Sequence, residues 1–310
     1  MTTPANADRT EPGQRDPVRV GVVGAGLMGG GFAELCALLG HDVRVVVSGP
    51  AAVTRDRDRL RRALDKAVAR QKMTAEAAAD AAARVSFGTE LAALGDRQFV
   101  LEAVGEEETV KAGVFAALDK AVEDDTAVLA STTSAIPVIR LAKATARPHR
   151  VIGVHFFNPV QRLALAEIIP SLLTADETTA AARVFVTGLG KEVVQSRDRS
   201  GFVVNALLVP YLLAAVRMVE SGFATAEDID KGMTLGCAHP LGPLQLIDLI
   251  GLDVLAAVGR ALYEEHREPL YGPPPLLSRM IDAGLLGRKS GQGFYDYRAA
   301  TTAASASASR

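Results

Sequence analysis

Short apolar runs alternate with amphipathic helical patterns over the first two thirds of the chain. Residues 18–23 (VRVGVV) and 42–47 (DVRVVV) have the β-branched, apolar composition of buried parallel strands, with a helical pattern through Leu39 between them. Further strands are predicted at 84–87, 98–101, 127–130, 151–154 and 192–195, and helices at 51–72, 75–83, 109–122 and 177–189. Successive strand–helix units predict an α/β fold, a doubly wound and mainly parallel sheet of order 3-2-1-4-5-6 with added strands.

From about residue 200 the pattern becomes helical only. Residues 202–221 are apolar nearly all round, which predicts a buried helix, and further helices are predicted at 226–235, 252–265 and 275–283. Pro/Gly-rich turns separate them at 239–243 and 272–275. We therefore expect a sheet domain over 17–198 and a smaller all-α domain over 199–298. Residues 1–16 and 299–310 lack periodicity and are predicted to be disordered.

Composition narrows the class of protein. The chain has 310 residues, 48% of them hydrophobic, and a formal net charge of −2, which argues against a nucleic-acid or anionic-membrane surface. No apolar run approaches the ~20 residues of a spanning helix, and the polar N-terminus does not resemble a signal peptide, so we expect a cytoplasmic protein. Cys36 and Cys237 lack metal-ligand spacing and are interpreted as core thiols, with no metal site expected.

A glycine-rich turn follows the first strand directly. Gly24 suits a tight turn, Gly26 a close approach of the backbone to a pyrophosphate, and Gly29 close packing of helix on strand. Leu27 and Met28 lie in the same turn, where the helix N-terminus would face the phosphates. In this setting the motif predicts a dinucleotide-binding Rossmann domain; the alternative is a tight turn without a ligand.

The end of the second strand lacks the expected acid. A carboxylate about 20 residues after the glycines binds the ribose hydroxyls of NAD, but Val47 stands there, followed by Ser48. This leaves room for a 2′-phosphate, with Ser48 donating a hydrogen bond and Arg44, Arg55 or Arg57 supplying charge. The expected cofactor is therefore NAD or NADP, and the alternative is NAD held by backbone contacts alone.

Polar clusters end the next two strands, on the edge where doubly wound sheets bind ligands. Glu106 belongs to an acidic run at 102–108, either as a carboxylate at a helix N-terminus or as a residue near the cofactor. Ser134 ends a hydroxyl run at 131–134 that either caps the helix starting at Pro137 or faces a substrate oxygen. The basic helix at 51–72 is either a solvated face or a site for the phosphates of an acyl carrier.

Residues 151–169 carry the strongest chemical signal. His155 ends one apolar run, residues 158–159 (Asn-Pro) form a turn, and a second apolar run carries Glu167. If the turn folds the runs together, Glu167 accepts from one ring nitrogen of His155 while the other faces a substrate. That is a general base with an orienting partner. The alternative is a half-buried histidine with a glutamate at the sheet rim.

Seven motifs in this order resemble one family. They are GAGLMGGG at 24–31, EAVGE at 102–106, STTS at 131–134, HFFNPV at 155–160 with Glu167, GFVVNALLVPYL at 201–212, HPLGPLQLIDLIGLD at 239–253 and GRKSGQGFYDY at 287–297. Over about residues 18–297 the chain resembles the short-chain L-3-hydroxyacyl-CoA dehydrogenases, the 3-hydroxybutyryl-CoA dehydrogenase group included. The resemblance implies an enzyme of fatty acid metabolism that forms a homodimer through its helical domain.

The resemblance also implies roles for individual residues. His155 matches the catalytic acid/base, Glu167 its partner, and Ser134 and Asn205 the groups that hold the substrate oxygen. Near the cofactor, Glu106 matches the glutamate of the family's acidic motif, and three further positions are assigned to that side: Lys111, Val47 and Thr132.

Several positions depart from the family pattern. Val47 replaces the family's acid, and Thr132 occupies the place of a common Asn near the nicotinamide. Gln161 replaces a common Pro, Arg162 follows it, and Ala206 stands where an Arg often follows the catalytic Asn. These changes flank the substrate mouth and leave the four catalytic positions intact, so an altered acyl group or acyl carrier is consistent with them.

We therefore expect an oxidoreductase that interconverts an L-3-hydroxyacyl thioester and its 3-ketoacyl thioester with NAD(P). One alternative is the same chemistry on an acyl-carrier-protein thioester in biosynthesis. A hydroxy-sugar-acid dehydrogenase is disfavoured because residues 155–160 read HFFNPV rather than HPxNPP. A non-catalytic nucleotide-binding scaffold is disfavoured by the intact catalytic positions.

Overall fold

The computed structural model describes residues 17–298; the segments predicted to be disordered, 1–16 and 299–310, lie outside the described residues. Within 17–298 eight strands form one sheet of order β3-β2-β1-β4-β5-β6-β7-β8. Every neighbouring pair is parallel except β6 and β7. This confirms the doubly wound order, with β7 and β8 as the added strands. The strands are β1 Arg19–Val23, β2 Asp42–Val46, β3 Val85–Gly88, β4 Phe99–Glu102, β5 Val128–Ser131, β6 Val151–Phe156, β7 Leu165–Pro170 and β8 Glu192–Gln195.

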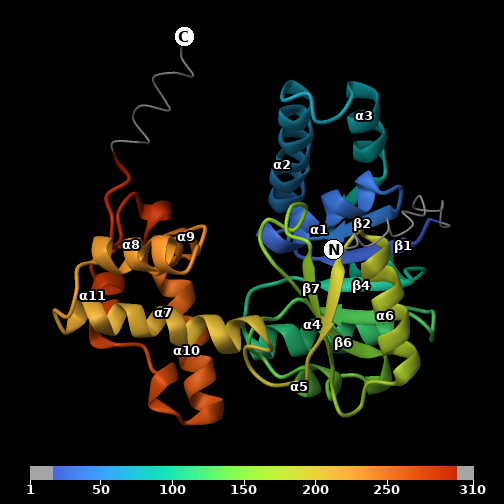
Figure 1. Ribbon diagram of the computed structural model, residues 1–310. Coiled ribbons are helices and arrows are strands. Elements are labelled where there is room, and N and C mark those ends of the chain that lie inside the picture. Colours follow the sequence, from blue (N-terminus) through green and yellow to red (C-terminus); the bar gives the residue numbers. More distant parts are fainter. Residues whose placement is uncertain (1–16, 299–310) are drawn as a thin grey trace, which may run out of the picture.

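Helices cover both faces of the sheet, because alternate strand residues are apolar on each side. One core packs the sheet against α1 (Leu27–Leu38), α2 (Pro50–Ala69), α3 (Ala75–Ala83) and α6 (Asp176–Gly188). A second core, on the opposite face, contains α4 (Glu108–Ala121) and α5 (Val138–Ala142). The α2–α3 hairpin projects beyond the sheet (Figure 1). The parallel strands leave one shared edge, at their carboxyl ends, free for a ligand.

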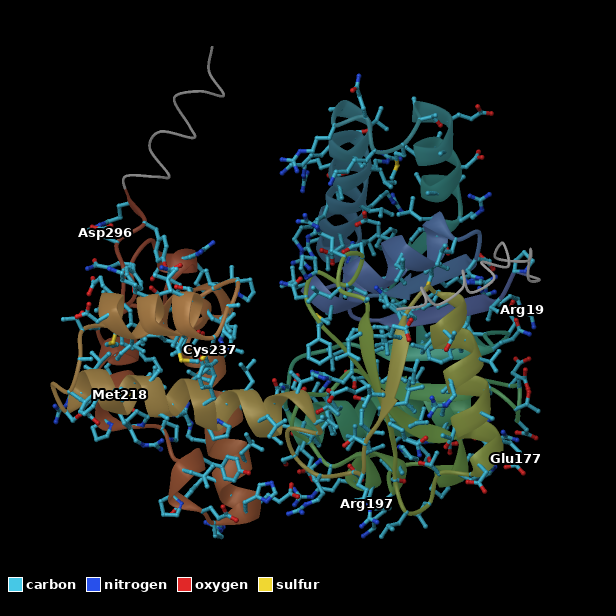
Figure 2. The ribbon with its side chains drawn as sticks, viewed as in Figure 1. Arg19, Glu177, Arg197, Met218, Cys237 and Asp296 are labelled. Atoms are coloured by element: carbon cyan, nitrogen blue, oxygen red, sulfur yellow. The ribbon has the colours of Figure 1, made fainter. Side chains whose placement is uncertain are left out.

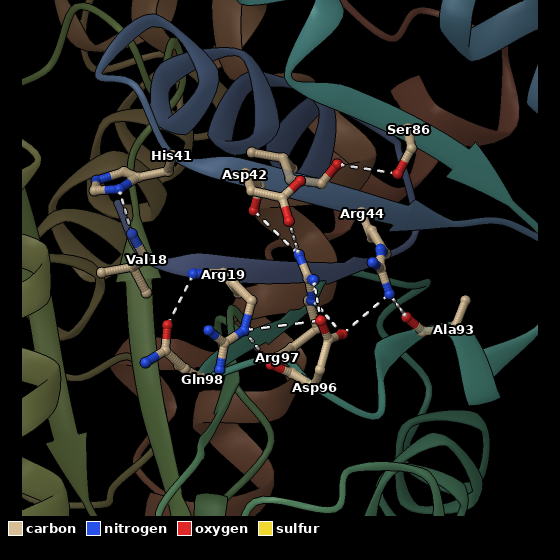
Figure 3. Close-up of polar contacts among 11 residues, drawn as sticks. Val18, Arg19, His41, Asp42, Arg44, Ser86, Ala93, Asp96, Arg97 and Gln98 are labelled. Carbon is tan, nitrogen blue, oxygen red and sulfur yellow. Dashed lines mark hydrogen bonds and ion pairs between the residues drawn. The ribbon is translucent and has the colours of Figure 1, made fainter. Parts of the chain in front are cut away.

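The opposite edge of the sheet is held by a buried arginine that the sequence pattern did not single out. Arg97 is fully buried, and its guanidinium contacts Asp42 and Asp96 at 2.7 Å each, at the start of β2 and before β4 (Figure 3). Because a buried charge is tolerated only when it is paired, this arrangement ties the beginnings of the strands together.

The remaining chain forms an all-helical domain. Its helices are α7 (Val204–Glu220), α8 (Ala226–Gly236), α9 (Pro243–Ile250), α10 (Leu252–His266) and α11 (Pro275–Asp282), around a core of their own. Helix α7 runs from the sheet domain into this domain (Figure 1). Met218 and Cys237 lie on the helical domain, whereas Arg19 and Glu177 lie on the sheet domain (Figure 2). No helix within the described residues is long and apolar enough to cross a membrane.

Helix α9 corrects the sequence prediction, which gave only a turn at 239–243. Pro243 occupies the first helical turn, and the carboxylate of Asp230 accepts hydrogen bonds from the backbone N–H groups of Leu244 and Gln245 at 2.7 and 3.0 Å. A cap supplied from another helix is a tertiary contact that a local pattern does not reveal.

Candidate active site

The glycine turn has the form that a dinucleotide pyrophosphate requires. Gly24 has a φ of +92°, and a Cβ there would lie 2.7 Å from the carbonyl oxygen of Ala103. A Cβ on Gly29 would collide with the carbonyl oxygen of Gly24, whereas Gly26 has open space beside it. Helix α1 begins without a side-chain cap and without an acidic residue in its first turn. Its first N–H groups are therefore available to an anion, and the turn fits a dinucleotide.

At the end of β2, Val47 is buried and its N–H donates to the carbonyl of Gly88, while Ser48 is exposed. Arg44, one of the arginines suggested for a 2′-phosphate, is engaged elsewhere. Its guanidinium donates to the carbonyl of Ala93 at 2.7 Å and to Asp96 at 3.0 Å (Figure 3). The structure thus does not direct Arg44 toward a cofactor ribose.

Arg55 is also engaged, because its guanidinium forks onto the carboxylate of Asp56 with two contacts of 2.9 Å. Arg57 faces a groove beside β3 rather than the glycine turn. Sequence reasoning missed Arg59, which donates to the carbonyl of Ala25 in the glycine turn and to Asp56, at 2.7 Å each. The only signal in the sequence was that residues 55 and 56 lie four and three positions before residue 59, a spacing that places side chains on one helix face. This spacing does not indicate which backbone group the Arg59 guanidinium contacts.

Lys111 is not on the surface of the site. It is 1% exposed and contacts the fully buried Glu102 at 2.8 Å, with Glu106 at 3.4 Å. Ser131 donates to the same Glu102 carboxylate at 2.6 Å. Lys111 therefore contacts the acidic loop from the interior of the protein. The sequence did not identify Glu102 as its partner.

Glu106 organises the loop that carries Ser134. One carboxylate oxygen accepts from the Thr133 hydroxyl at 2.6 Å and from the backbone N–H groups of Ser134 and Ala135 at 2.8 and 3.1 Å. Neither alternative from the sequence described this role. The neighbouring Thr132 is 8% exposed, and its buried hydroxyl has no hydrogen-bond partner among the described residues. It is an unpaired polar group at the ligand-binding edge, which fits a bound cofactor or substrate.

The side chains of the hydroxyl run at 131–134 have different roles. Thr133 accepts from the backbone N–H of Ile136 at 2.9 Å and so helps to shape the turn. Helix α5 begins at Val138 rather than Pro137, and its first N–H groups donate to Asp198 at 2.7 and 2.8 Å. Burial raises the pKa of Asp198 despite these two hydrogen bonds. The helix cap therefore comes from the domain junction, and Ser134 is left for another role.

His155 and Glu167 lie opposite each other on the antiparallel strands β6 and β7, joined by a turn with a cis Asn158–Pro159 bond. Glu167 is fully buried, and one of its carboxylate oxygens lies 2.7 Å from His155 Nδ1. On the other side of the ring, Ser134 Oγ lies 3.2 Å from Nε2. The structure thus brings three of the four suggested catalytic side chains into one hydrogen-bonded chain.

The fourth suggested residue is tied to this chain through the backbone. The second carboxylate oxygen of Glu167 accepts from the N–H groups of Val203 and Val204 at 2.9 and 3.0 Å, at the start of α7. Asn205 follows in the first turn of α7, half-buried. The helical domain therefore meets the sheet domain at the carboxylate that contacts His155 Nδ1.

Two models of one protein family together match most of the chain. Residues 19–199 match the family model described as 3-hydroxyacyl-CoA dehydrogenase, NAD binding domain, and residues 201–297 match the C-terminal domain of the same family. The chain belongs to the 3-hydroxyacyl-CoA dehydrogenase family. This confirms the resemblance drawn from the motifs.

Relatives within the 3-hydroxyacyl-CoA dehydrogenase family align over nearly their whole length. A 3-hydroxybutyryl-CoA dehydrogenase of Mycobacterium tuberculosis (strain H37Rv) is 53% identical over 90% of this chain and 98% of its own. The crystal structure of FadB2 from M. tuberculosis has 53% identity and a TM-score of 0.89, covering 91% of this chain and 100% of its own. That of (S)-3-hydroxybutyryl-CoA dehydrogenase PaaH1 from Ralstonia eutropha has 41% identity and a TM-score of 0.86, covering 90% and 99%.

Two cavities border the site of this family member. One, of about 520 Å³, extends from Ser134 and Glu106 to the small side chains Ala257 and Ala261 of α10. The other, of about 560 Å³, lies among the glycine turn, the basic face of α2 and the turn at 158–161. The first cavity therefore reaches the loop that carries Ser134, and the second reaches the glycine turn.

Gln161, which replaces a common Pro of the family, makes a contact beside the second cavity. Its side-chain amide donates to Glu34 of α1 at 2.7 Å. Burial raises the pKa of Glu34, although the hydrogen bond from Gln161 opposes the shift. Arg162, the next departure, is exposed. Lys191, which the sequence did not suggest, fixes the same turn by donating to the carbonyls of Val160 and Leu163.

Proposed function

We propose that this chain interconverts an L-3-hydroxyacyl-CoA and its 3-ketoacyl-CoA with a nicotinamide dinucleotide. The observation that carries the proposal is the chain from Ser134 Oγ to His155 Nε2 at 3.2 Å and from His155 Nδ1 to Glu167 at 2.7 Å. It lies at the carboxyl edge of the sheet, beside the glycine turn. The names of the relatives, 3-hydroxybutyryl-CoA dehydrogenases among them, support the substrate class, and the (S) form in one name supports the L configuration.

In this proposal His155 is the acid/base. Oxidation of a secondary alcohol requires removal of the hydroxyl proton, which His155 Nε2 accepts. The bound nicotinamide supplies the chemistry for the hydride that leaves the same carbon. Glu167 accepts the Nδ1–H, which fixes the ring tautomer and stabilises the imidazolium that forms. In the reverse direction the imidazolium returns its Nε2 proton to the ketone oxygen.

Ser134 and Asn205 are proposed to donate hydrogen bonds to the substrate oxygen. Donors of this kind contribute roughly 2.7–4 kcal/mol each where they have been removed from enzymes. Two observations support this assignment. Glu106 holds the backbone of Ser134 in place, and Asn205 makes no side-chain hydrogen bond within the described residues, so its amide is available to a ligand.

For the cofactor, we propose that the first-turn N–H groups at Gly26–Gly29 bind the pyrophosphate and that Thr132 lies on the nicotinamide side. Because Val47 offers no carboxylate to bind ribose hydroxyls or to repel a 2′-phosphate, the site is proposed to accept both NADH and NADPH. Arg44 and Arg55 are already paired with aspartates, which argues against strong selection for NADPH.

The acyl carrier is proposed to be coenzyme A. The basic face of α2 borders the 560 Å³ cavity through Arg59 and Lys66, a surface suited to phosphate groups. An acyl-carrier-protein thioester is the second candidate, favoured by the departures at Gln161 and Arg162 at the substrate mouth. Comparing rates on acetoacetyl-CoA and on the carrier-bound acetoacetyl group distinguishes the two.

We propose that the helical domain forms a homodimer. It exposes large apolar side chains that water does not favour, among them Leu207 (73% exposed), Phe223 (77%) and Leu235 (76%). Sedimentation equilibrium at twice the mass of the chain is expected, and a monomer at micromolar concentration would contradict the dimer. The cytoplasm is the proposed compartment, in keeping with the free thiols of Cys36 and Cys237. Cys36 is buried as expected, whereas the interpretation of Cys237 as a core thiol is wrong, because its side chain is exposed.

The central experiment measures the reduction of acetoacetyl-CoA by NADH and by NADPH, following the loss of reduced-cofactor absorbance. Turnover is expected with both cofactors, and no turnover with either would refute the proposal. His155→Ala is expected to abolish the activity. His149→Ala, which changes a histidine outside the site, serves as the control and should retain it.

A further inference from the structure

Phe202 lies at the junction of the two domains, and its side chain packs into the sheet domain rather than the helical domain. By sequence it precedes α7 of the helical domain, yet its ring is buried, 7% exposed, in the sheet-domain core that contains Phe115 and Leu141. A side chain that crosses a domain boundary in this way fixes the two domains relative to each other locally. Phe202 has no place in the chemistry proposed above.

The backbone at this point is held in an unusual conformation. Gly201 has a φ of +81°, and a Cβ there would lie 2.6 Å from Leu262. Phe202 itself has a φ of +47°, a left-handed conformation that residues with a Cβ rarely adopt. Hydrogen bonds from Phe202 N–H to Arg199 and from Ala206 N–H to Gly201 close the turn. Strained backbone of this kind persists only where the surrounding structure holds it.

This conformation has two consequences for the His155–Glu167 pair. The N–H groups that follow, on Val203 and Val204, donate to the Glu167 oxygen that does not face the imidazole. The Phe202 ring lies 5.5 Å from the His155 ring, and the ring of Phe157 lies 4.8 Å away. Apolar rings therefore flank the imidazole, while its two nitrogens remain directed at Glu167 and Ser134.

We infer that Phe202 is a positioning residue that holds the His155 imidazole in line with Glu167 and Ser134 and couples this alignment to the docking of the helical domain. This inference rests on the proposed function for its kinetic readout. Its structural content does not depend on turnover: without the Phe202 ring, the imidazole gains space to rotate away from its two partners.

The test compares substitutions that separate stability from alignment. Phe202→Ala and Phe202→Gly both remove the ring, but glycine suits the left-handed backbone better, so the glycine variant is expected to melt at the higher temperature. Positioning predicts that both lose kcat alike, by about tenfold to a hundredfold, with the KM for the cofactor little changed. Phe202→Leu should retain an intermediate kcat. Phe115→Leu is the control, since Phe115 is fully buried in the same core and no ring contact joins it to His155 within residues 17–298.

Nitrogen NMR of the histidine rings provides a readout without turnover. The ring-nitrogen signals of His155 are expected to shift or broaden in Phe202→Leu and to stay unchanged in Phe115→Leu. A kcat that follows thermal stability across all four variants, or His155 signals that are the same in Phe202→Leu as in the parent, would overturn the inference. If the parent protein shows no turnover, the proposed function fails, and the NMR comparison still decides the positioning role.

Discussion

Replacing Glu167 by Gln tests the proposed proton-handling chain by exchanging one carboxylate oxygen for an NH2 group. The carboxylate accepts three hydrogen bonds, from His155 Nδ1 at 2.7 Å and from the N–H groups of Val203 and Val204 at 2.9 and 3.0 Å. A glutamine amide has an acceptor on one side only. If its oxygen faces the two backbone N–H groups, its NH2 faces Nδ1, which must then become an acceptor. The proton moves to Nε2, so His155, the proposed base, no longer presents a lone pair to the substrate.

The geometry sets the size of the effect. The opposite amide orientation would keep the productive tautomer but leave two buried N–H groups facing an NH2 group. Unpaired buried donors cost about 1–3 kcal/mol each, so this orientation is disfavoured by roughly 2–6 kcal/mol. At about 1.4 kcal/mol per factor of ten, the productive population falls by roughly 30-fold to 10⁴-fold. The upper end is comparable to the loss of about 10⁴ in kcat when the orienting Asp of a serine protease becomes Asn.

Initial rates of acetoacetyl-CoA reduction and of 3-hydroxybutyryl-CoA oxidation measure this loss. Because an enzyme does not change the overall equilibrium, kcat/KM should fall by the same factor in both directions. Asp198→Asn is the matched control: that carboxylate also accepts two backbone N–H groups, at α5, but within residues 17–298 no imidazole contacts it. It should lower stability and retain kcat. A Glu167→Gln variant within tenfold of the parent would refute the reasoning.

Three further outcomes follow from the same structure. Val47→Asp is expected to shift the ratio of kcat/KM values toward NADH, because the carboxylate binds ribose hydroxyls and repels a 2′-phosphate; an unchanged ratio would exclude this position as the selector. Burial raises the pKa of Glu34 above its ordinary 4.5, so the folded state loses stability as the pH rises from 4.5 through this raised pKa. Glu34→Gln should therefore raise Tm near neutral pH and not near pH 4.5, which thermal melts at the two pH values would show. Asp248→Asn should lower the free energy of unfolding by roughly 1–3 kcal/mol in urea titrations, because both carboxylate oxygens accept backbone N–H groups, from Phe294 and Tyr295, and an amide has one acceptor. An unchanged urea midpoint would contradict it.

Local pattern was sufficient for most elements of the fold. The predicted strand at 151–154 and the turn at 158–159 correspond to β6 and the hairpin that sets His155 opposite Glu167. Alternation and apolar runs report burial on a sheet, and this information is local. Helix α9 was missed because its cap is Asp230, a residue of another helix. What holds the C-terminal motif at 287–297 is likewise visible only in the structure, where the Asp248 carboxylate accepts hydrogen bonds from its backbone.

The sequence by itself determined the chemistry that is available: a glycine turn after a buried strand, one histidine and one glutamate on a hairpin, a hydroxyl at the next strand end, and no acid at Val47. Tertiary structure alone decided what each charge contacts. Lys111 and Arg97 became buried partners of carboxylates, Arg44 turned toward Asp96, and Phe202 crossed the domain junction to lie beside His155. The physical reason is that burial of a charge or a ring depends on groups far away in the sequence, whose positions are set only when the sheet and the helical domain pack together.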